Sequence, residues 1–416
     1  MVEEGRKMRV TALNILLIAA VIVSITCSGC IEGGKEGENI NQVSETGDNY
    51  RLITDMRGKE VRIPKDPERV VVMSDGFVES TMIIFGIGDK LVGLPRTPKD
   101  YTYNYHSDVT SENYTYRGGR YTPVVLYPKL KELTVVGRKT PNYETLASLD
   151  PDVVILRSGS CSFYCYNTDE NAKKVIEMIE KLNLPVVVIQ APTCYDKPTL
   201  NTIFQEIEVL GEIFDKQKEA QKLINHLDKQ ITVIKERTRD IPEDKKPTVL
   251  YFGLSAKARE QGGVGNVRGI DTPDAYFIED IVNAKNAFRG MGQQIMSSEQ
   301  VLALNPDVIL LPTSNGYHPP RELYESEHFR NIHDLKAIRE KRVYSLPWTP
   351  SRCATRLEFP IDLMIAAKGA YPERFSDIAI SEWVLGYYKE LYGVDTEMAK
   401  KLRSAQWLDW AVEEDF

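Results

Sequence analysis

This sequence of 416 residues has little of the chemistry used to bind nucleic acid or a bare metal ion. Its 52 lysines and arginines are outnumbered by 60 aspartates and glutamates, which gives a net charge of −8. Because nucleic acid binding depends on an excess of positive charge, this balance argues against a nucleic acid partner. The five histidines form no ligand cluster, and His328 and His333 are spaced too far apart to share a helical face. We therefore predict no protein-bound metal ion and no cofactor.

The sequence also lacks the residue patterns of common enzyme sites. No Ser-His-Asp or Cys-His arrangement can be read from it, and no pair of carboxylates stands at the ends of the expected strands. The glycine-rich residues 262–265 lack the Lys-Ser/Thr ending of a phosphate-binding loop and lie far from a helix start. The prediction is a protein that is not an enzyme.

No hydrophobic run is long enough for a typical transmembrane helix. The apolar residues 10–25 fall short of the ~20 residues needed to span a bilayer. Basic residues precede this run and small residues with Cys30 follow it, which is typical of a secretory signal that ends before a lipidated cysteine. We predict a signal peptide over residues 1–29, a lipid on Cys30 and a flexible tether over residues 30–50. The alternative is an uncleaved anchor helix, and both place the protein outside the cell and attached to the membrane.

One segment occurs twice in the chain, at residues 144–156 and 299–311. Each copy has a glutamate, a short helical pattern, a Pro-Asp pair and a continuous apolar run. The proline should end the helix, and an apolar run of this length predicts a strand that is buried on both faces. Such strands are typical of parallel α/β sheets. The long interval between the copies predicts two lobes built on one plan, with a ligand cleft between them.

The remaining pattern divides the chain at a long helix. We expect an N-terminal lobe over residues 51–215, a linker helix over residues 216–241 and a C-terminal lobe with C-terminal helices over residues 242–416. Apolar residues recur at helical spacing from about residue 200 to residue 239, and Gly211 is expected to break or bend this helix. The tyrosine-rich residues 101–127 interrupt the first lobe and are expected to form an inserted loop that is mobile or partly packed.

Several short motifs, taken in order, resemble the substrate-binding proteins of ABC importers that take up iron-siderophores, haem and vitamin B12. The resemblance covers residues 52–375, and its landmarks are residues 53–61, 67–71, 136–144, both Pro-Asp strands and residues 366–375. It implies two Rossmann-like α/β lobes joined by a single long rigid helix, with limited closure. The implied partners are a permease dimer with its ATPase and a small-molecule metal complex.

The resemblance also implies a role for the repeated glutamates. In such proteins a glutamate on the outer rim of each lobe pairs with arginines of the permease, and Glu144 and Glu299 occupy those positions. Two separated carboxylates facing fixed guanidinium groups would set docking orientation and encounter rate. The simpler alternative is that both are solvated glutamates favoured by the helix dipole in a first turn.

The ligand is expected between the lobes, at the carboxyl ends of the parallel strands. These ends are rich in arginine and aromatic residues, which suit a large anionic ligand with a flat or apolar shell. Arg138 is the leading candidate because siderophore binders with a similar Gly-Arg-x-x-Pro-Asn-x-Glu stretch place this arginine in the cleft. Further candidates follow the other strands, although Arg356 could instead pair with Glu358: Tyr164, Trp348, Arg352, Arg356, Asp75 and Phe77.

The cysteines allow two interpretations. With Cys30 lipidated, an extracellular disulfide among Cys161, Cys165 and Cys194 is preferred, and Cys194 could pair with either of the others. The alternative is contact with a soft metal or haem in the cleft, with Cys353 facing from the second lobe.

Together these patterns predict a lipid-anchored binding component that captures a siderophore-like iron complex or a related metal chelate. A haem or corrinoid binder of the same class is the main alternative. A nitrogenase-like metal-cluster protein shares the expected fold, but a secretory signal argues against it because clusters are loaded inside the cell. A surface sensor or adhesin would have no reason to keep two docking glutamates.

Overall fold

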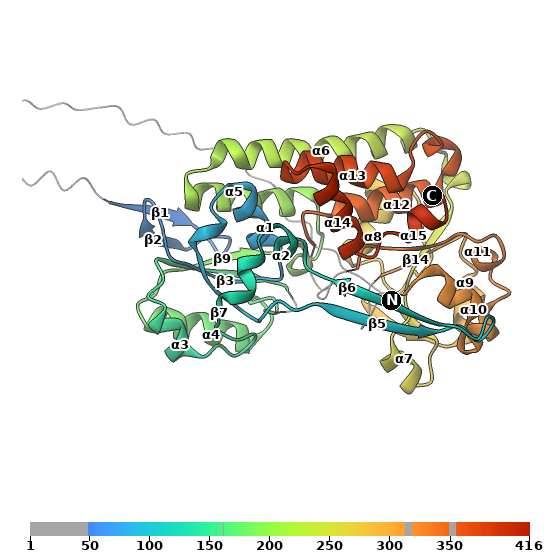
Figure 1. Ribbon diagram of the computed structural model, residues 1–416, viewed down its shortest axis with the longest axis horizontal. Helices are drawn as coiled ribbons and strands as arrows, with labels where there is room; N and C mark the ends of the chain where they lie inside the picture. The colour runs from blue at the N-terminus through green and yellow to red at the C-terminus, as the bar shows by residue number, and fades with distance from the viewer. Residues whose placement is uncertain (1–48, 161, 313–317, 349–354) are drawn as a thin grey trace, which may run out of the picture. The chain divides into compact units, whose positions relative to one another are not determined.

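The computed structural model describes residues 49–160, 162–312, 318–348 and 355–416 (Figure 1). Residues 48–416 form one compact unit, which is described here by itself. The expected signal peptide, residues 30–48 of the tether with Cys30, and also Cys161, Arg352 and Cys353 lie outside the described residues, whereas Tyr50 at the end of the predicted tether begins strand β1 (Tyr50–Thr54). Within the described ranges, no helix combines the length and apolar character required to cross a membrane.

The first lobe, defined here as residues 49–214, is built on a sheet of five parallel strands in the order β7-β4-β3-β8-β9. The central strands are runs of valine, isoleucine and leucine that are buried on both faces, as the continuous apolar pattern predicts. The strands are β3 (Val70–Met73), β4 (Leu91–Leu94), β7 (Thr134–Val135), β8 (Val153–Ser158) and β9 (Val186–Gln190). A separate antiparallel hairpin, β1 (Tyr50–Thr54) and β2 (Glu60–Pro64), precedes them.

The second lobe, defined as residues 248–416, has a mixed sheet in the order β13-β11-β10-β14-β15, with β12 also paired to β10. Strands β10, β12, β14 and β15 are parallel to one another, whereas β11 pairs antiparallel with both of its neighbours, β10 and β13. The apolar pattern predicted β10 (Thr248–Gly253), β14 (Val308–Leu311) and β15 (Val343–Ser345). It did not predict β11 (Gly265–Arg268), β12 (Lys285–Asn286) and β13 (Gln293–Met296), which are short and largely polar.

The two copies of the repeated segment share the same backbone conformation before their prolines. Asp150 and Asn305 adopt left-handed conformations, with φ of 43° and 37°, directly before the two prolines. The following aspartates then accept hydrogen bonds from the start of the neighbouring strand. Asp152 accepts from the backbone N–H groups that precede β3, and Asp307 accepts from the N–H of Thr248 in β10. The repeat therefore sets how each Pro-Asp strand enters its sheet.

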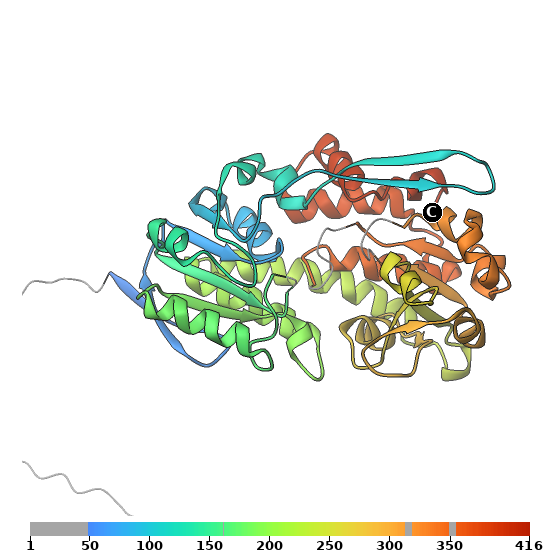
Figure 2. The same ribbon diagram turned by 90° about the horizontal axis from the view of Figure 1, so that it is seen from below.

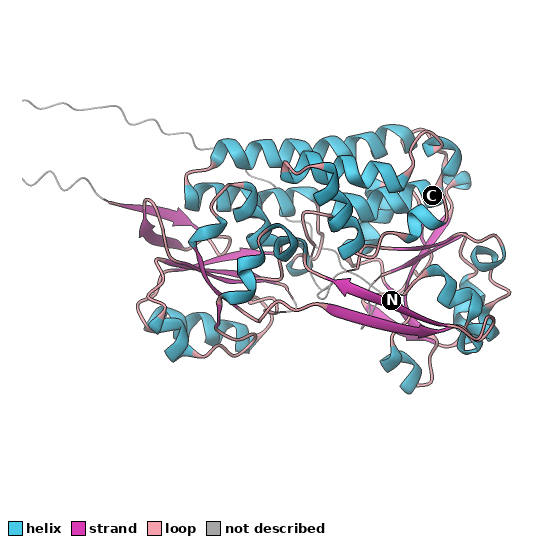
Figure 3. Cartoon of the chain, viewed as in Figure 1, coloured by secondary structure: helices cyan, strands magenta, loops and turns pink. Residues whose placement is uncertain are grey.

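Helices cover the sheets and connect the lobes (Figure 3). The first lobe contains α1 (Phe77–Ile84), α2 (Thr122–Leu126), α3 (Tyr143–Ser148), α4 (Glu170–Lys181) and α5 (Leu200–Phe214). The second contains α7 (Ala256–Glu260), α8 (Pro273–Tyr276), α9 (Ser298–Leu304), α10 (Pro320–Glu325), α11 (Lys336–Arg339), α12 (Phe359–Ala370), α13 (Ile380–Tyr392), α14 (Thr396–Ala405) and α15 (Trp410–Glu413). Between them α6 (Gln217–Thr238) packs on α5 of the first lobe and on α12 and α13 of the second.

The long helical pattern is interrupted at Asp215 and not at Gly211, where the sequence predicted a break. Asp215 has a φ of 55° and ends α5, while Gly211 lies inside this helix. A side chain at Gly211 would begin 2.8 Å from the Cβ of Ala220 in α6. The glycine is therefore explained by the close packing of α5 against α6, because only a residue without a Cβ fits there.

The tyrosine-rich insertion is a hairpin and not an irregular loop, so this part of the prediction was wrong, whereas its strands are partly packed as one of the two expectations had it. Residues 101–119 form an antiparallel hairpin of β5 (Tyr101–His106) and β6 (Asn113–Gly119), which α2 follows. Figure 2 shows this hairpin leaving the first lobe and extending along the second. Alternating tyrosines gave a period-two pattern typical of a half-exposed strand, and this signal was hidden by the neighbouring charged and polar residues.

Candidate functional site

A cavity of about 260 Å³ lies where the two lobes meet. Thr193 and Tyr195, which follow β9, line it from the first lobe. The second lobe lines it with Arg268 at the end of β11 and with Thr355 and Arg356, which precede α12. Its position agrees with the rule that open α/β sheets bind ligands beyond the carboxyl ends of their strands.

Arg356 lines this cavity, and it shares the ring of Tyr121 with Arg96, which lines a separate pocket of the first lobe. The guanidinium carbons of Arg96 and Arg356 lie 4.7 Å and 4.9 Å from the ring centre of Tyr121. Burial lowers the pKa of Arg96, and the positive charges of Arg138 and Arg356 lower it further, while Asp75 acts in the opposite direction. Three cations close enough to affect one another form a local concentration of positive charge on an acidic protein. Such a cluster suits an anionic ligand, because guanidinium groups bind carboxylate or phosphate-like oxygens with two hydrogen bonds.

Asp75 is a buried carboxylate that contacts Arg96. Only 2% of its surface is exposed, and its carboxylate accepts hydrogen bonds from the backbone N–H and the hydroxyl of Ser162 at 2.9 Å and 2.7 Å. The same carboxylate lies 3.8 Å from the guanidinium of Arg96. The carboxylate of Asp75 therefore contacts Arg96 and the loop after β8. The structure gives Asp75 a supporting role in place of the predicted ligand contact.

Phe77 and Trp348 were predicted to contact ligand, but both are buried by other side chains. Phe77 is 0% exposed and lies under the guanidinium of Arg157 at 4.0 Å. Trp348 is 3% exposed, with its ring centre 4.9 Å from that of Tyr101 and 4.6 Å from that of Trp407. A sequence shows that an aromatic residue follows a strand, but it does not show which neighbours will cover the ring.

Arg157 forms the main buried ion pair near the cavity. Its Nε and Nη2 groups donate to the two carboxylate oxygens of Glu206 at 2.5 Å and 2.7 Å, and both side chains are fully buried. Burial raises the pKa of Glu206, and the charge of Arg157 opposes this effect. The remaining Nη1 donates to the backbone oxygen of Thr355 at 2.6 Å. Arg157 therefore connects β8 of the first lobe to the cavity-lining segment of the second.

Arg138 and Tyr164 lie at the exposed rim of the first lobe. Arg138 is exposed in the loop after β7, close enough to Arg96 to lower its pKa. Tyr164 is 50% exposed, and the ammonium of Lys139 lies 3.9 Å from its ring centre. Their positions leave both side chains accessible from solvent, so the prediction that they contact ligand stands as a proposal. Arg352 lies outside the described residues.

The cysteines form a covalent link at the same rim. Cys165, after β8, and Cys194, after β9, are joined in a disulfide, which selects one of the two pairings that the sequence left open. This bond fixes the loops that follow two neighbouring strands and lies next to the cavity-lining Thr193. In the parts of the chain that the structure describes, no group of three or more histidine, cysteine or acidic residues is arranged to hold a metal ion.

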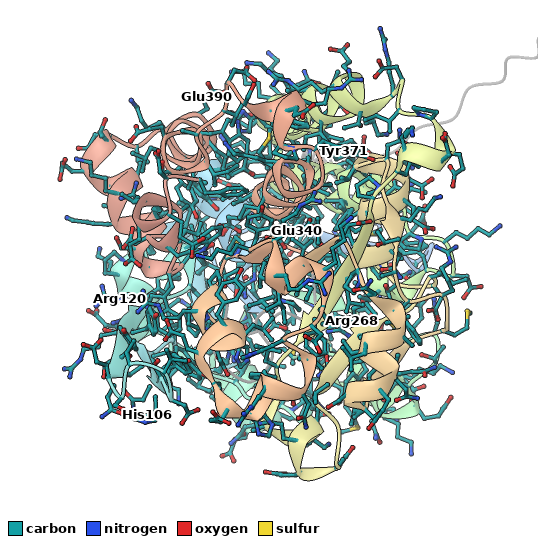
Figure 4. The ribbon with its side chains drawn as sticks, turned by 90° about the vertical axis from the view of Figure 1, so that its right-hand side faces the viewer. His106, Arg120, Arg268, Glu340, Tyr371 and Glu390 are labelled. Carbon is teal, nitrogen blue, oxygen red and sulfur yellow. A yellow bond between two sulfur atoms is a disulfide. The ribbon has the colours of Figure 1, made fainter. Side chains whose placement is uncertain are left out.

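The second lobe gives the cavity an acidic wall. Four carboxylates line it: Asp271, Asp274, Glu358 and Asp362. Asp274 lies 3.6 Å from the guanidinium of Arg268, a residue visible in Figure 4. Glu358 accepts a hydrogen bond of 2.5 Å from the hydroxyl of Tyr392. Arg356 and Glu358, which the sequence offered as an alternative ion pair, both line this cavity.

The two repeated glutamates lie away from the cavity. Glu144 is exposed in the first turn of α3, and Glu299 is exposed in the first turn of α9. A hydrogen bond from the hydroxyl of Ser297 lowers the pKa of Glu299. Each carboxylate is therefore presented to solvent from a matched structural position, as an outer docking residue requires.

The sequence interpretation missed Arg96 and Arg157 as individual site residues. A detectable signal existed for Arg96, because it follows β4 as closely as the predicted residues follow their strands. Arg157 directly follows the apolar run of β8, but nothing local shows that its partner is Glu206 in a distant helix.

Comparison with known proteins identifies the family. The periplasmic binding protein family matches residues 74–349. The chain belongs to this family. It is a substrate-binding protein of the ABC-transporter type and not an enzyme, which excludes the nitrogenase-like alternative.

Individual relatives cover most of the chain. An uncharacterised ABC transporter substrate-binding lipoprotein of Bacillus subtilis, YvrC, is 24% identical over 87% of this chain and 97% of its own length. The molybdate-binding protein MolA of Haemophilus influenzae is 24% identical over 82% and 91%. The structure of MolA covers 83% of this chain and 98% of its own, with a TM-score of 0.60 and 21% identity. The Fe(3+)-citrate-binding protein YfmC of Bacillus subtilis is 23% identical over 82% and 91%.

Proposed function

We propose that this protein captures a small anionic metal complex outside the cell, foremost a ferric chelate of the siderophore or citrate type, and delivers it to an ABC permease. The observation that carries this proposal is Arg356, which lines the cavity between the lobes and shares the ring of Tyr121 with Arg96; Arg138 lies close enough to Arg96 to affect its pKa. Support also comes from the relative named for Fe(3+)-citrate.

The two walls of the cavity narrow the class of ligand. Anionic oxygens would face the arginines, whereas hydroxyl or amine donors would face the carboxylates of Asp271, Asp274 and Glu358. A ligand that is strongly anionic over its whole surface would meet like charge on that second wall, which disfavours it. A ferric chelate with carboxylates on one side and hydrogen-bond donors on the other suits both walls.

Cell-surface attachment and permease docking complete the proposal. We assign residues 1–29 to a signal peptide, Cys30 to lipidation, and the exposed Glu144 and Glu299 to docking on the permease dimer. The printed name of YvrC as a lipoprotein supports the first two assignments.

A thermal-shift panel tests the ligand class. The chain from residue 31 is mixed with ferric citrate, a ferric carboxylate siderophore, molybdate, haem and cobalamin. A ligand at one hundred times its dissociation constant should stabilise the protein by about 2.7 kcal/mol. We expect ferric citrate or the ferric siderophore to raise the melting temperature, and Arg96→Gln with Arg356→Gln to abolish the shift. If none of the five compounds produces a shift, the proposal fails.

Arg339→Gln is the matched control. It removes one positive charge from α11, half of the change in the double variant, at a side chain that donates to the backbone oxygen of Asp334 at 2.8 Å. Its ligand-induced shift should equal that of the parent protein. An equal loss of binding in the control would show that overall charge, and not the arginine cluster, is responsible.

Molybdate is the second candidate because of the size of the cavity. A volume of about 260 Å³ lies just under the range of roughly 300–1,000 Å³ for pockets of drug-sized ligands. Such a space favours a compact oxyanion, and MolA, named for molybdate, is among the relatives. A shift with molybdate and not with either ferric chelate would select this candidate. The same volume makes haem and corrinoids the poorer fits.

A further inference from the structure

The β5–β6 hairpin belongs to the first lobe by sequence but contacts the second lobe along its length. Its strands are paired from Tyr101 with Gly119 to His106 with Asn113, so it is a continuous two-stranded ribbon. An isolated ribbon of this kind has marginal stability in water, and it needs a surface to pack on. Figure 2 shows that this surface is the second lobe. In Figure 4, His106 is labelled near the tip of the hairpin and Arg120 near its base.

A buried polar contact fixes the middle of the hairpin. The hydroxyl of Tyr103 donates to the carboxylate of Glu322 in α10 at 3.1 Å. The Nδ1 of His318 lies 2.9 Å from the same carboxylate oxygen, and its ring centre lies 5.7 Å from that of Tyr103. His318 is only 4% exposed and Glu322 only 5%. Because these polar groups are shielded from water and satisfied by one another, separating the hairpin from α10 would leave them unsatisfied.

The tip of the hairpin is attached as well. The carboxylate of Asp108 accepts a hydrogen bond of 2.8 Å from the backbone N–H of Glu327 in the second lobe. The guanidinium of Arg321 in α10 lies 4.3 Å from the ring centre of Tyr114 in β6. Contacts at the tip are as specific as those in the middle, so the hairpin does not simply rest on the second lobe.

The base of the hairpin packs closely against two tryptophans of the second lobe, whose ring centres lie 4.6 Å apart. A Cβ at Gly119 would lie 2.8 Å from Trp348 and 2.9 Å from Trp407, so only glycine permits this approach. The indole N–H of Trp407 donates to the backbone oxygen of Arg117 at 3.0 Å. The backbone N–H of Arg120 donates to the oxygen of Ala405 at 3.0 Å.

We propose that this hairpin is a strap that holds the second lobe against the first and limits how far the cleft can open. Helix α6 joins the lobes on one side, and the strap connects them again through contacts at its base, middle and tip. A two-lobed protein with one connection can hinge, whereas a second connection removes most of that freedom. The cleft is therefore held near its bound width before ligand arrives, and this inference does not depend on which ligand binds.

Shortening the strap tests the inference directly. Thr102 pairs with Arg117, so residues 103–116 can be replaced by Asn-Gly, which forms a two-residue hairpin turn. Nitroxide labels are attached through an unnatural amino acid at the exposed positions 177 in α4 and 340 after α11, one on each lobe. Pulsed electron spin resonance then gives the distribution of distances between the lobes. We expect a single narrow distribution in the full chain, and a broader distribution shifted to longer distances in the shortened chain.

A tip-only variant is the matched control. Replacing residues 108–111 by Asn-Gly removes the Asp108 contact but keeps Tyr103, Gly119 and the tryptophan contacts. Its distribution should stay close to that of the full chain. If the shortened chain is folded by circular dichroism and keeps the narrow distribution of the full chain, the strap inference is wrong.

A point variant keeps the test decisive if the shortened chain does not fold. Tyr103→Phe with Asp108→Asn removes the hydroxyl donor in the middle of the strap and weakens the acceptor at its tip. Hydrogen exchange followed by mass spectrometry should then be faster in residues 318–325 and 355–359 than in the parent protein, with exchange in β3 unchanged. Unchanged exchange in both segments would overturn the inference, since it would show that these contacts do not restrain the second lobe.

Discussion

The two lobes are alike where their Pro-Asp strands begin and different where the strands end. At the beginning, each lobe has a short helix, a left-handed residue before proline, and an aspartate that accepts from the neighbouring strand. At the end, the apolar run of β8 is followed by the buried Arg157, while the matching position after the apolar run of β14 is Pro312. The repeat thus specifies how the lobes are built, and the unrepeated strand ends specify what lies in the cleft.

The charged residues near the cleft also differ between the two lobes. The first lobe contributes Arg96 and Arg138 and a disulfide rim, whereas the second contributes Arg268 and Arg356 together with four carboxylates. An internal duplication of architecture does not require a duplicated site. Each lobe is free to present different chemistry, because strand-end loops carry few of the packing constraints that the sheets impose.

The largest expected effect comes from the residue that has no counterpart in the second lobe. Arg157→Met would leave Glu206 buried without its partner, and breaking a buried ion pair in this way costs about 3–5 kcal/mol. Urea denaturation should show this loss in the free energy of unfolding. Adding Glu206→Leu should recover much of it, because both charges are then removed. A single variant that loses less than about 1 kcal/mol would contradict the importance of this pair.

An intermediate effect is expected from the aspartates that the lobes share. Asp152→Ala and Asp307→Ala each remove a charged acceptor of backbone N–H groups, and each should cost about 1.5–3 kcal/mol. Because they lie in different lobes, the two losses should add in the double variant. Unequal losses would show that the repeat is similar in sequence but not in energetic role.

The pH dependence distinguishes Asp307 from an ordinary surface carboxylate. Burial acts to raise the pKa of Asp307, but its hydrogen bonds with Lys336 and Thr248 outweigh burial and hold the pKa below 3.8. A carboxyl group with a lowered pKa stabilises the folded state above its unfolded pKa, and this contribution disappears as the pH falls through the folded pKa. The stability difference between the parent and Asp307→Ala should therefore be full at pH 7 and shrink below about pH 4.

The smallest expected effect on the isolated protein comes from the paired outer glutamates. Glu144→Lys with Glu299→Lys should leave the melting temperature and ligand binding unchanged, since both side chains are exposed. Uptake in cells that carry the transporter should fall by roughly tenfold or more, because reversed charges oppose docking. Lys174→Glu on the exposed face of α4 is a control for charge reversal elsewhere on the first lobe. Loss of ligand binding in the glutamate double variant would show that these residues do not act in docking.

Much of the fold could be predicted because its signals are local. Runs of valine, isoleucine and leucine identified β3, β8, β9, β10 and β14, and the Glu to Pro-Asp repeat indicated two lobes. The short polar strands β11 to β13 could not be found in this way. Their pairing depends on partners already in the sheet and not on their own apolar pattern.

The site was only partly predictable for the same reason. The strand-end rule selected Arg356, which lines the cavity, and Arg138, whose contact with ligand stays a prediction, but it also selected Phe77 and Trp348, which distant side chains bury. Which rings are covered depends on residues far away in the sequence, namely Arg157, Tyr101 and Trp407. No local pattern contains that information.

The sequence by itself determined the class of the protein: two α/β lobes, each with buried parallel strands, a connecting helix and a pair of exposed glutamates on matched helices. These features depend on short-range periodicity and on residues such as proline, whose effect on the backbone is the same in any surroundings. Only the tertiary structure decided that the tyrosine-rich insertion is an ordered strap, and that Arg157 joins the lobes within the cleft. Both depend on contacts between residues that are distant in sequence, and such contacts exist only once the lobes have packed together.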